Sequence, residues 1–158
     1  MAEQSEGNVA VKQIVLVVDD EPDILQSLQT LLELALPSVE VLTAESGPKA
    51  LEKLQQHPVD LIISDFKMPG MTGLEFLDKA KAAAPGTPRI LMTAFPDLDV
   101  AMRAINEAEI QNFITKPLDP EHVTEIIKKA LGDRRSKVLR DRSFARSFEA
   151  LRKRKPKP

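Results

Sequence analysis

Five short apolar runs alternate along this chain with longer segments in which apolar residues recur at helical spacing. The apolar runs predict strands over residues 11–18, 39–44, 60–65, 89–93 and 112–115. The periodic segments predict helices over 22–36, 47–56, 74–84, 98–108 and 120–131, the last closed by Gly132. Short buried strands joined by helices form a parallel sheet with helices on both faces. We therefore expect an α/β doubly wound sandwich with the strand order 2-1-3-4-5.

Two of the predicted strands run directly into carboxylates. Asp19 and Asp20 follow the first strand, and Asp65 ends the third. The expected strand order places the first and third strands side by side, so the three carboxylates should meet at the edge where the strands end. Thr93 ends the fourth strand and Lys116 follows the fifth, which brings a hydroxyl and an ammonium group to the same edge.

The chemistry of this group of side chains points to phosphate. Three neighbouring carboxylates repel one another unless cations compensate them, and clustered carboxylate oxygens suit a hard divalent cation. Three negative charges, one positive charge from Lys116 and two from Mg²⁺ sum to zero. Such a pocket could accept a phosphoryl group, with Asp65 as the nucleophile and with Thr93 and Lys116 holding the phosphoryl oxygens.

Each of these residues also has an ordinary interpretation when taken alone. Asp19 and Asp20 suit the positive end of a helix, and Asp65 suits a turn-capping position. Thr93 and Lys116 are unremarkable as a strand end and a surface residue. Because all five fall at the ends of four strands that share one edge, we favour a functional site over five separate coincidences.

The same residues carry a resemblance to a known family. The matching motifs are Asp19-Asp20, Asp65 followed by Met68-Pro69 and Gly73, Thr93-Ala94, Phe113 and Lys116-Pro117. In this order and spacing they resemble the CheY-like receiver domain of bacterial-type two-component response regulators, over roughly residues 11–131. The resemblance implies a flavodoxin-like (βα)5 fold and a cis peptide bond between Lys116 and Pro117.

The resemblance also implies how the site works. A histidine kinase or a histidine phosphotransfer protein would donate a phosphoryl group to Asp65 in the presence of Mg²⁺ or Mn²⁺. Asp20 and Asp65 would bind the metal directly, Asp19 would act largely through water, and the backbone carbonyl of Lys67 would be a further ligand. The chain would then be no enzyme in the usual sense, since it would catalyse only its own phosphorylation and dephosphorylation.

A conformational switch is a further implication of the resemblance. Thr93 would move toward the phosphoryl group and the Phe113 ring would turn inward behind it. The face made by the fourth helix, fifth strand and fifth helix would then bind a downstream protein or a second copy of the chain. Phe113 lacks the hydroxyl of the tyrosine often found there, which excludes hydrogen-bonded versions of the switch. A bulky Phe95 two residues after Thr93 predicts slow loss of the phosphoryl group.

The composition of the chain excludes several kinds of chemistry and structure. The chain contains no Cys, which excludes disulfides and thiolate chemistry, and no apolar run approaches the length of a membrane span. Its start lacks the features of a signal peptide, so we expect a cytoplasmic protein without membrane contact. Residues 1–132 hold 11 Lys/Arg and 21 Asp/Glu, a net charge of −10, whereas residues 133–158 hold 11 and 3, a net charge of +8.

This charge contrast divides the chain into a frayed start (1–10), a receiver domain (11–131) and a basic tail (132–158). The tail could be an extension of the last helix, a solvated segment or a linker to a further domain. It could also contact nucleic acid through residues 152–155, although we favour protein contact because only two aromatic residues accompany its cations. A phosphatase with an Asp nucleophile is a further alternative, but it would need an acid at position 67, which is Lys.

Overall fold

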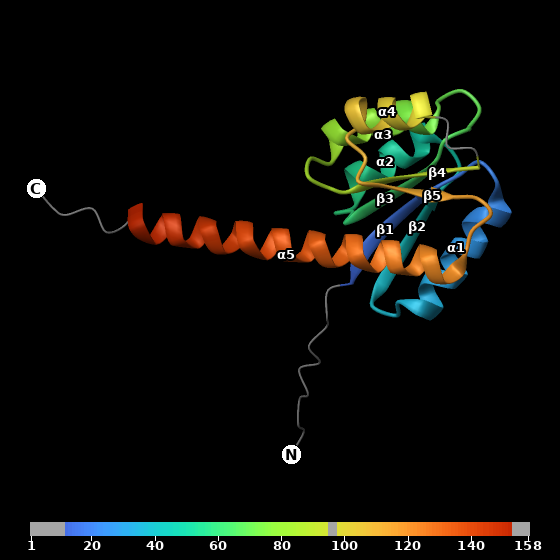
Figure 1. The fold of residues 1–158 in the computed structure, drawn as a ribbon. Helices are drawn as coiled ribbons and strands as arrows, with labels where there is room; N and C mark the ends of the chain where they lie inside the picture. The colour runs from blue at the N-terminus through green and yellow to red at the C-terminus, as the bar shows by residue number, and fades with distance from the viewer. Residues whose placement is uncertain (1–11, 95–97, 153–158) are drawn as a thin grey trace, which may run out of the picture.

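The computed structural model describes residues 12–94 and 98–152, so the predictions for residues 1–10, Phe95 and residues 153–155 lie outside the described part. The strands are β1 (Gln13–Val18), β2 (Val39–Ala44), β3 (Leu61–Asp65), β4 (Arg89–Thr93) and β5 (Asn112–Thr115). The helices are α1 (Pro22–Ala35), α2 (Gly47–Gln56), α3 (Gly73–Ala83), α4 (Leu98–Glu107) and α5 (Pro120–Arg152). Strands and helices alternate along the chain as predicted (Figure 1).

The five strands form one parallel sheet with the order β2-β1-β3-β4-β5, which confirms the predicted topology. β3 lies at the centre and is buried along its whole length. In the register of the sheet, Ile63 of β3 lies beside Val17 of β1 and Ile90 of β4. All strands point the same way, so Asp65 and Thr93 end at one edge of the sheet, here called the carboxyl edge.

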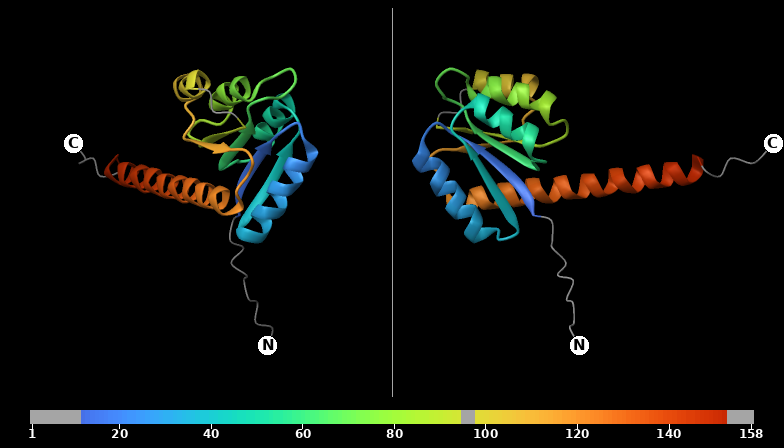
Figure 2. Two further views of the ribbon diagram at one scale, coloured as in Figure 1. Left: turned by 45° about the vertical axis from the view of Figure 1, so that its right-hand side comes forward. Right: turned by 180° about the vertical axis from the view of Figure 1, so that it is seen from behind.

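Side chains alternate between two helical layers along each central strand. In β1, Leu16 packs in the cluster shared with α2, α3 and α4, whereas Val15 and Val17 pack in the cluster shared with α1 and α5. Figure 2 shows these layers on opposite faces of the sheet. Successive side chains of a strand point to opposite faces, so an uninterrupted apolar run serves both layers. This explains why the central strands read as continuous apolar runs in the sequence.

One side chain of α4 differs from the helical-spacing prediction. Helical spacing predicts Ile105 on the inner side of α4 with Ala104 and Ala108, but the residue is 53% exposed. Ala104 and Ala108 lie four residues apart and are fully buried, so they define the face that packs on the core. Ile105 is rotated about 100° from Ala104 by the helical turn and leaves that face.

The last helix does not end at Gly132, which corrects the predicted boundary. α5 runs from Pro120 to Arg152 and projects well beyond the sheet (Figures 1 and 2). A glycine that closes a helix takes a positive φ, but positive φ angles in the described residues are confined to Gly70, Gly86 and Glu109. One interior glycine costs a helix only about 1 kcal/mol, and the residues around Gly132 are good helix formers.

The projecting part of α5 remains attached to the domain for one further turn. Arg134 donates a hydrogen bond from Nη1 to the carbonyl oxygen of Gly86, at 3.0 Å, in the turn between α3 and β4. Leu131, on the preceding turn, is buried in the core. Within the described residues, no helix is long and apolar enough to cross a membrane.

Candidate functional site

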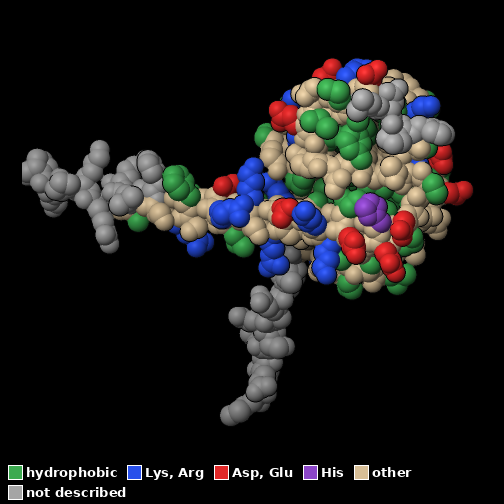
Figure 3. Space-filling model, viewed as in Figure 1, with side chains coloured by type: hydrophobic (Ala, Val, Ile, Leu, Met, Phe, Trp, Pro, Cys, Tyr) green, Lys and Arg blue, Asp and Glu red, His purple; other side chains and the backbone are tan. Residues whose placement is uncertain are grey.

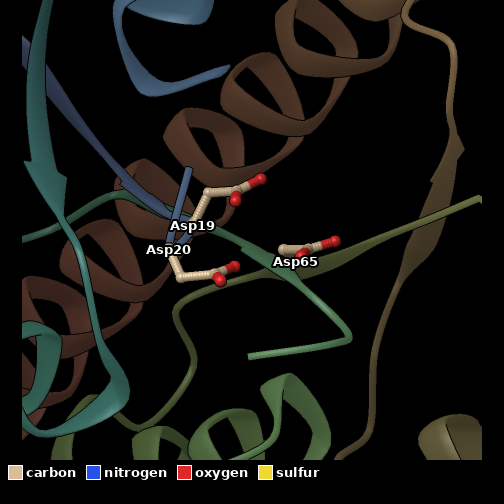
Figure 4. A group of neighbouring side chains, drawn as sticks. All are labelled: Asp19, Asp20 and Asp65. Atoms are coloured by element: carbon tan, nitrogen blue, oxygen red, sulfur yellow. The ribbon is translucent and has the colours of Figure 1, made fainter. Parts of the chain in front are cut away.

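Three carboxylates meet at the carboxyl edge of the sheet. Asp19 and Asp20 directly follow β1, and Asp65 is the last residue of β3. One oxygen of each lies within 4.8 Å of the others, and Figure 4 shows the three side chains converging on one space. Asp19 and Asp65 are buried and Asp20 is half-buried. The predicted acidic cluster is therefore present, with the geometry of a site that could hold a metal ion.

Asp19 is positioned by backbone contacts on both sides. Its amide donates to the carbonyl oxygen of Ala44 at the end of β2, at 3.2 Å. Its Oδ1 accepts a hydrogen bond from the amide of Glu21, at 2.9 Å, just before the start of α1. The strand end and the helix start thus hold this carboxylate in place and leave its Oδ2 for the centre of the site.

Lys116 joins two of the carboxylates. Its Nζ lies 3.1 Å from Asp19 Oδ2 and 3.1 Å from Asp65 Oδ1. The backbone brings it there from β5, because the amide of Lys116 donates to the carbonyl oxygen of Thr93 at 2.9 Å. The peptide bond between Lys116 and Pro117 is cis, which confirms that prediction. Thr93 is buried at the end of β4, on the same edge.

The charges in the site alter its proton affinities. Burial raises the pKa of the Asp65 carboxyl above its ordinary value, and the negative charge of Asp19 adds to this, while Lys116 opposes both. For Lys116, burial lowers the pKa of the ammonium group, but its hydrogen bonds to Asp19 and Asp65 outweigh burial and raise it overall. The site therefore favours the charged form of Lys116, while the environment of Asp65 makes its charged form less favourable than in water.

The turn after Asp65 explains why a glycine begins α3. A Cβ atom on Gly73 would overlap the carbonyl oxygen of Asp65 and would lie 2.8 Å from its carbonyl carbon and 3.0 Å from the Cα of Phe66. The amide of Gly73 also donates to the carbonyl oxygen of Phe66 at 2.8 Å. Thr72 caps the helix by accepting from the amide of Glu75 at 3.2 Å. The start of α3 thus lies directly against the backbone of the candidate nucleophile.

Two predicted site residues lie apart from the Lys116–carboxylate contacts. Phe113 is half-buried in β5 and packs against the core cluster on the α2, α3 and α4 side of the sheet. The side chain of Lys67 is exposed on the turn that follows Asp65. The switch role of Phe113 and the ligand role of the Lys67 carbonyl stay predictions.

Sequence reasoning missed two buried polar residues near the ends of these strands. Ser64 donates from Oγ to the carbonyl oxygen of Asp65, at 3.0 Å, and so supports the same carbonyl that Gly73 approaches. Arg89, at the amino end of β4, is buried and donates to the carbonyl oxygens of Thr87 and Ala108, each at 2.9 Å. A polar residue inside or at the start of an apolar run was the available signal, because buried polar groups need partners.

Fold and site together define a class of protein. A doubly wound parallel sheet with an acidic trio and a lysine at its carboxyl edge is the architecture of a signalling receiver domain. The family model described as "Response regulator receiver domain" matches residues 15–128, and the chain belongs to this family.

Transcriptional regulatory proteins are among the relatives that the chain resembles. The chain is 35% identical over 117 residues to the hydrogenase transcriptional regulatory protein HoxA of Cupriavidus necator, a match covering 74% of this chain and 24% of that protein. It spans about a quarter of the length of the curated relatives it matches.

Solved structures show the same fold. The signal receiver domain of an HD domain-containing protein from Pseudomonas fluorescens Pf-5 superposes with a TM-score of 0.76 at 36% identity, covering 82% of this chain and 94% of that one. A structure described as adenylate cyclase from Rhodopirellula baltica has a TM-score of 0.71 at 30% identity and covers 91% of this chain and 99% of that one.

Proposed function

We propose that Asp65 accepts a phosphoryl group from a histidine kinase or a histidine phosphotransfer protein, in a reaction that depends on Mg²⁺ or Mn²⁺. One observation carries the proposal: Lys116 Nζ lies 3.1 Å from both Asp19 and Asp65, inside a cluster of three carboxylates. Negative charge develops on the oxygens of a phosphoryl group during its transfer. An ammonium group and a divalent cation at the carboxyl edge would stabilise that charge. Family membership supports the same role in two-component signalling.

The residues present fit a hard divalent cation. Asp20 and Asp65 would bind it directly, with Asp19 acting largely through water and the Lys67 carbonyl as a further ligand. Carboxylate and carbonyl oxygens are the donors that Mg²⁺ and Mn²⁺ prefer. Bound there, the cation would supply positive charge to the oxygens of the transferred group.

The chain's own residues would perform the transfer. A carboxylate oxygen of Asp65 attacks phosphorus, a new O–P bond forms, and the P–N bond to the donor imidazole breaks, with its electron pair returning to the imidazole. Lys116 and the Thr93 hydroxyl would hold phosphoryl oxygens as charge develops on them. The chain's only other reaction would be hydrolysis of the Asp65 phosphoryl group by water, and we propose that Phe95 slows this hydrolysis.

Phosphorylation of Asp65 would change the surface of the domain that a downstream protein or a second copy binds. Thr93 and Phe113 lie on the neighbouring strands β4 and β5, so movement of the Thr93 hydroxyl toward the phosphoryl group could pass to the Phe113 ring. The exposed side chains of Met102 and Ile105 on α4 offer apolar area for a downstream protein or a second copy. The regulatory names of the relatives, such as HoxA, support a signalling output.

Small phosphodonors test the proposal. Acetyl or carbamoyl phosphate with Mg²⁺ should add one phosphoryl group to the wild type and to Asp78→Ala, which removes an exposed acid on α3, but not to Asp65→Ala. Intact-protein mass spectrometry reads the gain, and size-exclusion chromatography reads any change of assembly. No Mg²⁺-dependent gain on the wild type would reject the function, and an unchanged gain on Asp65→Ala would reject the nucleophile.

Nucleic-acid binding by the projecting helix is the second candidate function. Exposed cations of α5, among them Arg135, Arg140, Arg142 and Arg146, support it. Binding to duplex DNA should then be salt-sensitive and independent of Asp65. Titration of labelled duplex at two salt concentrations, with the wild type and Asp65→Ala, measures both properties.

A further inference from the structure

A second concave site lies at the opposite edge of the sheet, under the base of the projecting helix. It is a cavity of about 210 Å³ between the α3–β4 turn, the residue before β5 and α5. Its walls include Gly86, Pro88 and Gln111 on one side and Asp133, Arg134 and Lys137 on the other. The last three residues follow Gly132, so the cavity exists only because α5 continues beyond that glycine.

The guanidinium group of Arg134 is held in this cavity with one donor unused. Nη1 donates to the carbonyl oxygen of Gly86 at 3.0 Å, which fixes the group against the α3–β4 turn. Nε is buried and has no hydrogen-bond acceptor among the residues that the structure describes. A buried N–H group without an acceptor is unfavourable, so a guest that drew the guanidinium group toward an acceptor in the cavity would relieve this cost.

The charge and size of the cavity define that guest. Arg134 and Lys137 contribute two positive charges and Asp133 one negative charge, so the lining has a net charge of +1 that a monoanion would neutralise. On the face seen in Figure 3, Lys and Arg side chains gather on α5 where it leaves the rounded domain. The volume is below the roughly 300–1,000 Å³ of sites for drug-sized ligands. Guanidinium groups bind carboxylates and phosphates through paired N–H donors.

We infer that this cavity, here called the α5 cavity, binds a small oxyanion of the carboxylate or phosphate class through Arg134 and Lys137. The site is separate from the carboxylates, because β4 and β5 begin beside the cavity and end at the carboxyl edge of the sheet. A bound oxyanion would connect the α3–β4 turn to the base of the projecting helix. The anion would then stabilise the direction in which α5 leaves the domain.

Titration with inorganic phosphate and, in a separate arm, with acetate tests the inference. The full chain is used in Mg²⁺-free buffer at constant ionic strength, and backbone amide shifts are followed by NMR. Saturable shifts at Gly86, Gln111 and Ala130, with one dissociation constant, are expected for at least one anion. The arm that saturates at the lower concentration identifies the class, and saturation by neither anion would overturn the inference.

Matched variants locate the binding. Arg134→Gln should weaken it about tenfold or more, as expected when a charge-assisted contact is lost, whereas Arg135→Gln, which removes an exposed charge from the same helix, should leave it unchanged. Equal, non-saturable shifts in all proteins would mean an adventitious ion only. If Arg134→Gln fails to fold, Lys137→Gln decides, since weaker binding supports the α5 cavity and unchanged binding overturns it.

Discussion

Asp65 is an ionisable side chain whose charge opposes the stability of the fold. Its side chain is only 10% exposed, and burial together with Asp19 raises its pKa despite the contact with Lys116. Below about pH 4 the carboxyl is protonated in both folded and unfolded states. Stability is lost as the pH rises from there through the raised folded pKa, because the unfolded chain releases the proton more readily.

Asp65→Asn should therefore stabilise the metal-free protein at pH 7. The amide cannot ionise, so the penalty of about 1.4 kcal/mol for each unit of raised pKa disappears. The advantage over the wild type should shrink as the pH falls toward 4. Thermal unfolding in Mg²⁺-free buffer between pH 4 and pH 8 measures this difference.

Asp78→Asn is the control for that measurement, because Asp78 is an exposed carboxylate far from the cluster along α3. It should change stability by less than about 0.5 kcal/mol at any of these pH values. Added Mg²⁺ should stabilise the wild type more than Asp65→Asn, since a ligand stabilises the state that binds it. A wild type that is more stable than Asp65→Asn at pH 7 without metal would contradict the charge argument.

The start of α3 controls where Asp65 lies, and this can be tested with two glycines in equivalent positions. Gly73 and Gly47 each follow a capping residue at a helix start, Thr72 and Ser46. A Cβ on Gly73 would meet the rigid backbone of Asp65, whereas a Cβ on Gly47 would meet the Met71 side chain, most closely at its Sδ. A methyl group at position 73 would therefore require the backbone to shift, whereas one at position 47 would require a side chain to move.

Gly73→Ala should slow phosphorylation by acetyl phosphate about 10- to 100-fold, because the backbone that carries the nucleophile must shift. It should also destabilise the fold by about 1–3 kcal/mol through overpacking. Gly47→Ala should keep the wild-type rate, because Met71 can change rotamer. Mass spectrometry against time gives the rates, and equal rates for both variants would show that the close approach of α3 has no part in placing Asp65.

The other end of β4 is held by Arg89, whose side chain is 4% exposed. Its guanidinium donates to the carbonyl oxygens of Thr87 and Ala108, and to that of Glu109 at 3.2 Å. The contacts with Ala108 and Glu109 join β4 to the residues that follow α4. Burial lowers the pKa of this arginine, but its hydrogen bonds satisfy the buried group.

Arg89→Met should destabilise the protein by about 3 kcal/mol, because it leaves buried carbonyl groups without donors. Arg103→Met provides the comparison, since the Arg103 side chain is 63% exposed and forms an i,i+4 pair with Glu107 at 3.5 Å. Its loss should cost less than about 1 kcal/mol. Urea denaturation of both variants measures the difference, and similar losses would contradict the anchoring role of Arg89.

The shape of the whole molecule depends on α5 continuing as one helix across Gly132. A Cβ atom at this position would meet nothing within 4 Å. Gly132→Ala should therefore stabilise the protein by about 0.5–1 kcal/mol through helix propensity alone. The buried Leu131 and the bond from Arg134 to Gly86 place Gly132 within the part of α5 attached to the domain, so the gain should appear as a rise in Tm.

Gly132→Pro is the disruptive counterpart. Proline inside a helix removes a backbone donor and clashes with the preceding turn, so this variant should lose about 3 kcal/mol and part of its helical circular dichroism. If residues after Gly132 formed no continuous helix with α5, both substitutions would leave Tm and helicity almost unchanged. That result would restore the boundary predicted at Gly132.

Local sequence information suffices for several elements of the fold. Four elements have the predicted boundaries, namely those over 39–44, 47–56, 89–93 and 112–115. Their boundaries are set by apolar runs and by flanking Gly and Pro residues, which are features of short segments. The strand order followed from the rules for parallel sheets, and it brought the acids, Thr93 and Lys116 to one edge.

Local sequence information fails where contacts between distant segments decide the structure. Gly132 resembles a helix end, but contacts of Leu131 and Arg134 with the domain favour a continuous helix. Arg89 resembles an ordinary strand residue, but two of its three acceptors, Ala108 and Glu109, lie in the segment after α4, about 20 positions away in the chain. Ile105 has the spacing of a core residue, yet the packing of Ala104 and Ala108 turns it outward.

The sequence by itself determined the alternation of strands and helices, the order of the sheet and the identity of the residues at its carboxyl edge. These follow from the periodicity of apolar residues and from the residues that end each run, which are properties of short segments. Only the tertiary structure decided that one ammonium group contacts two carboxylates, that Gly73 lies against Asp65 and that α5 forms one wall of a cavity with Arg134. Such contacts depend on distances between segments far apart in the chain, and packing sets those distances.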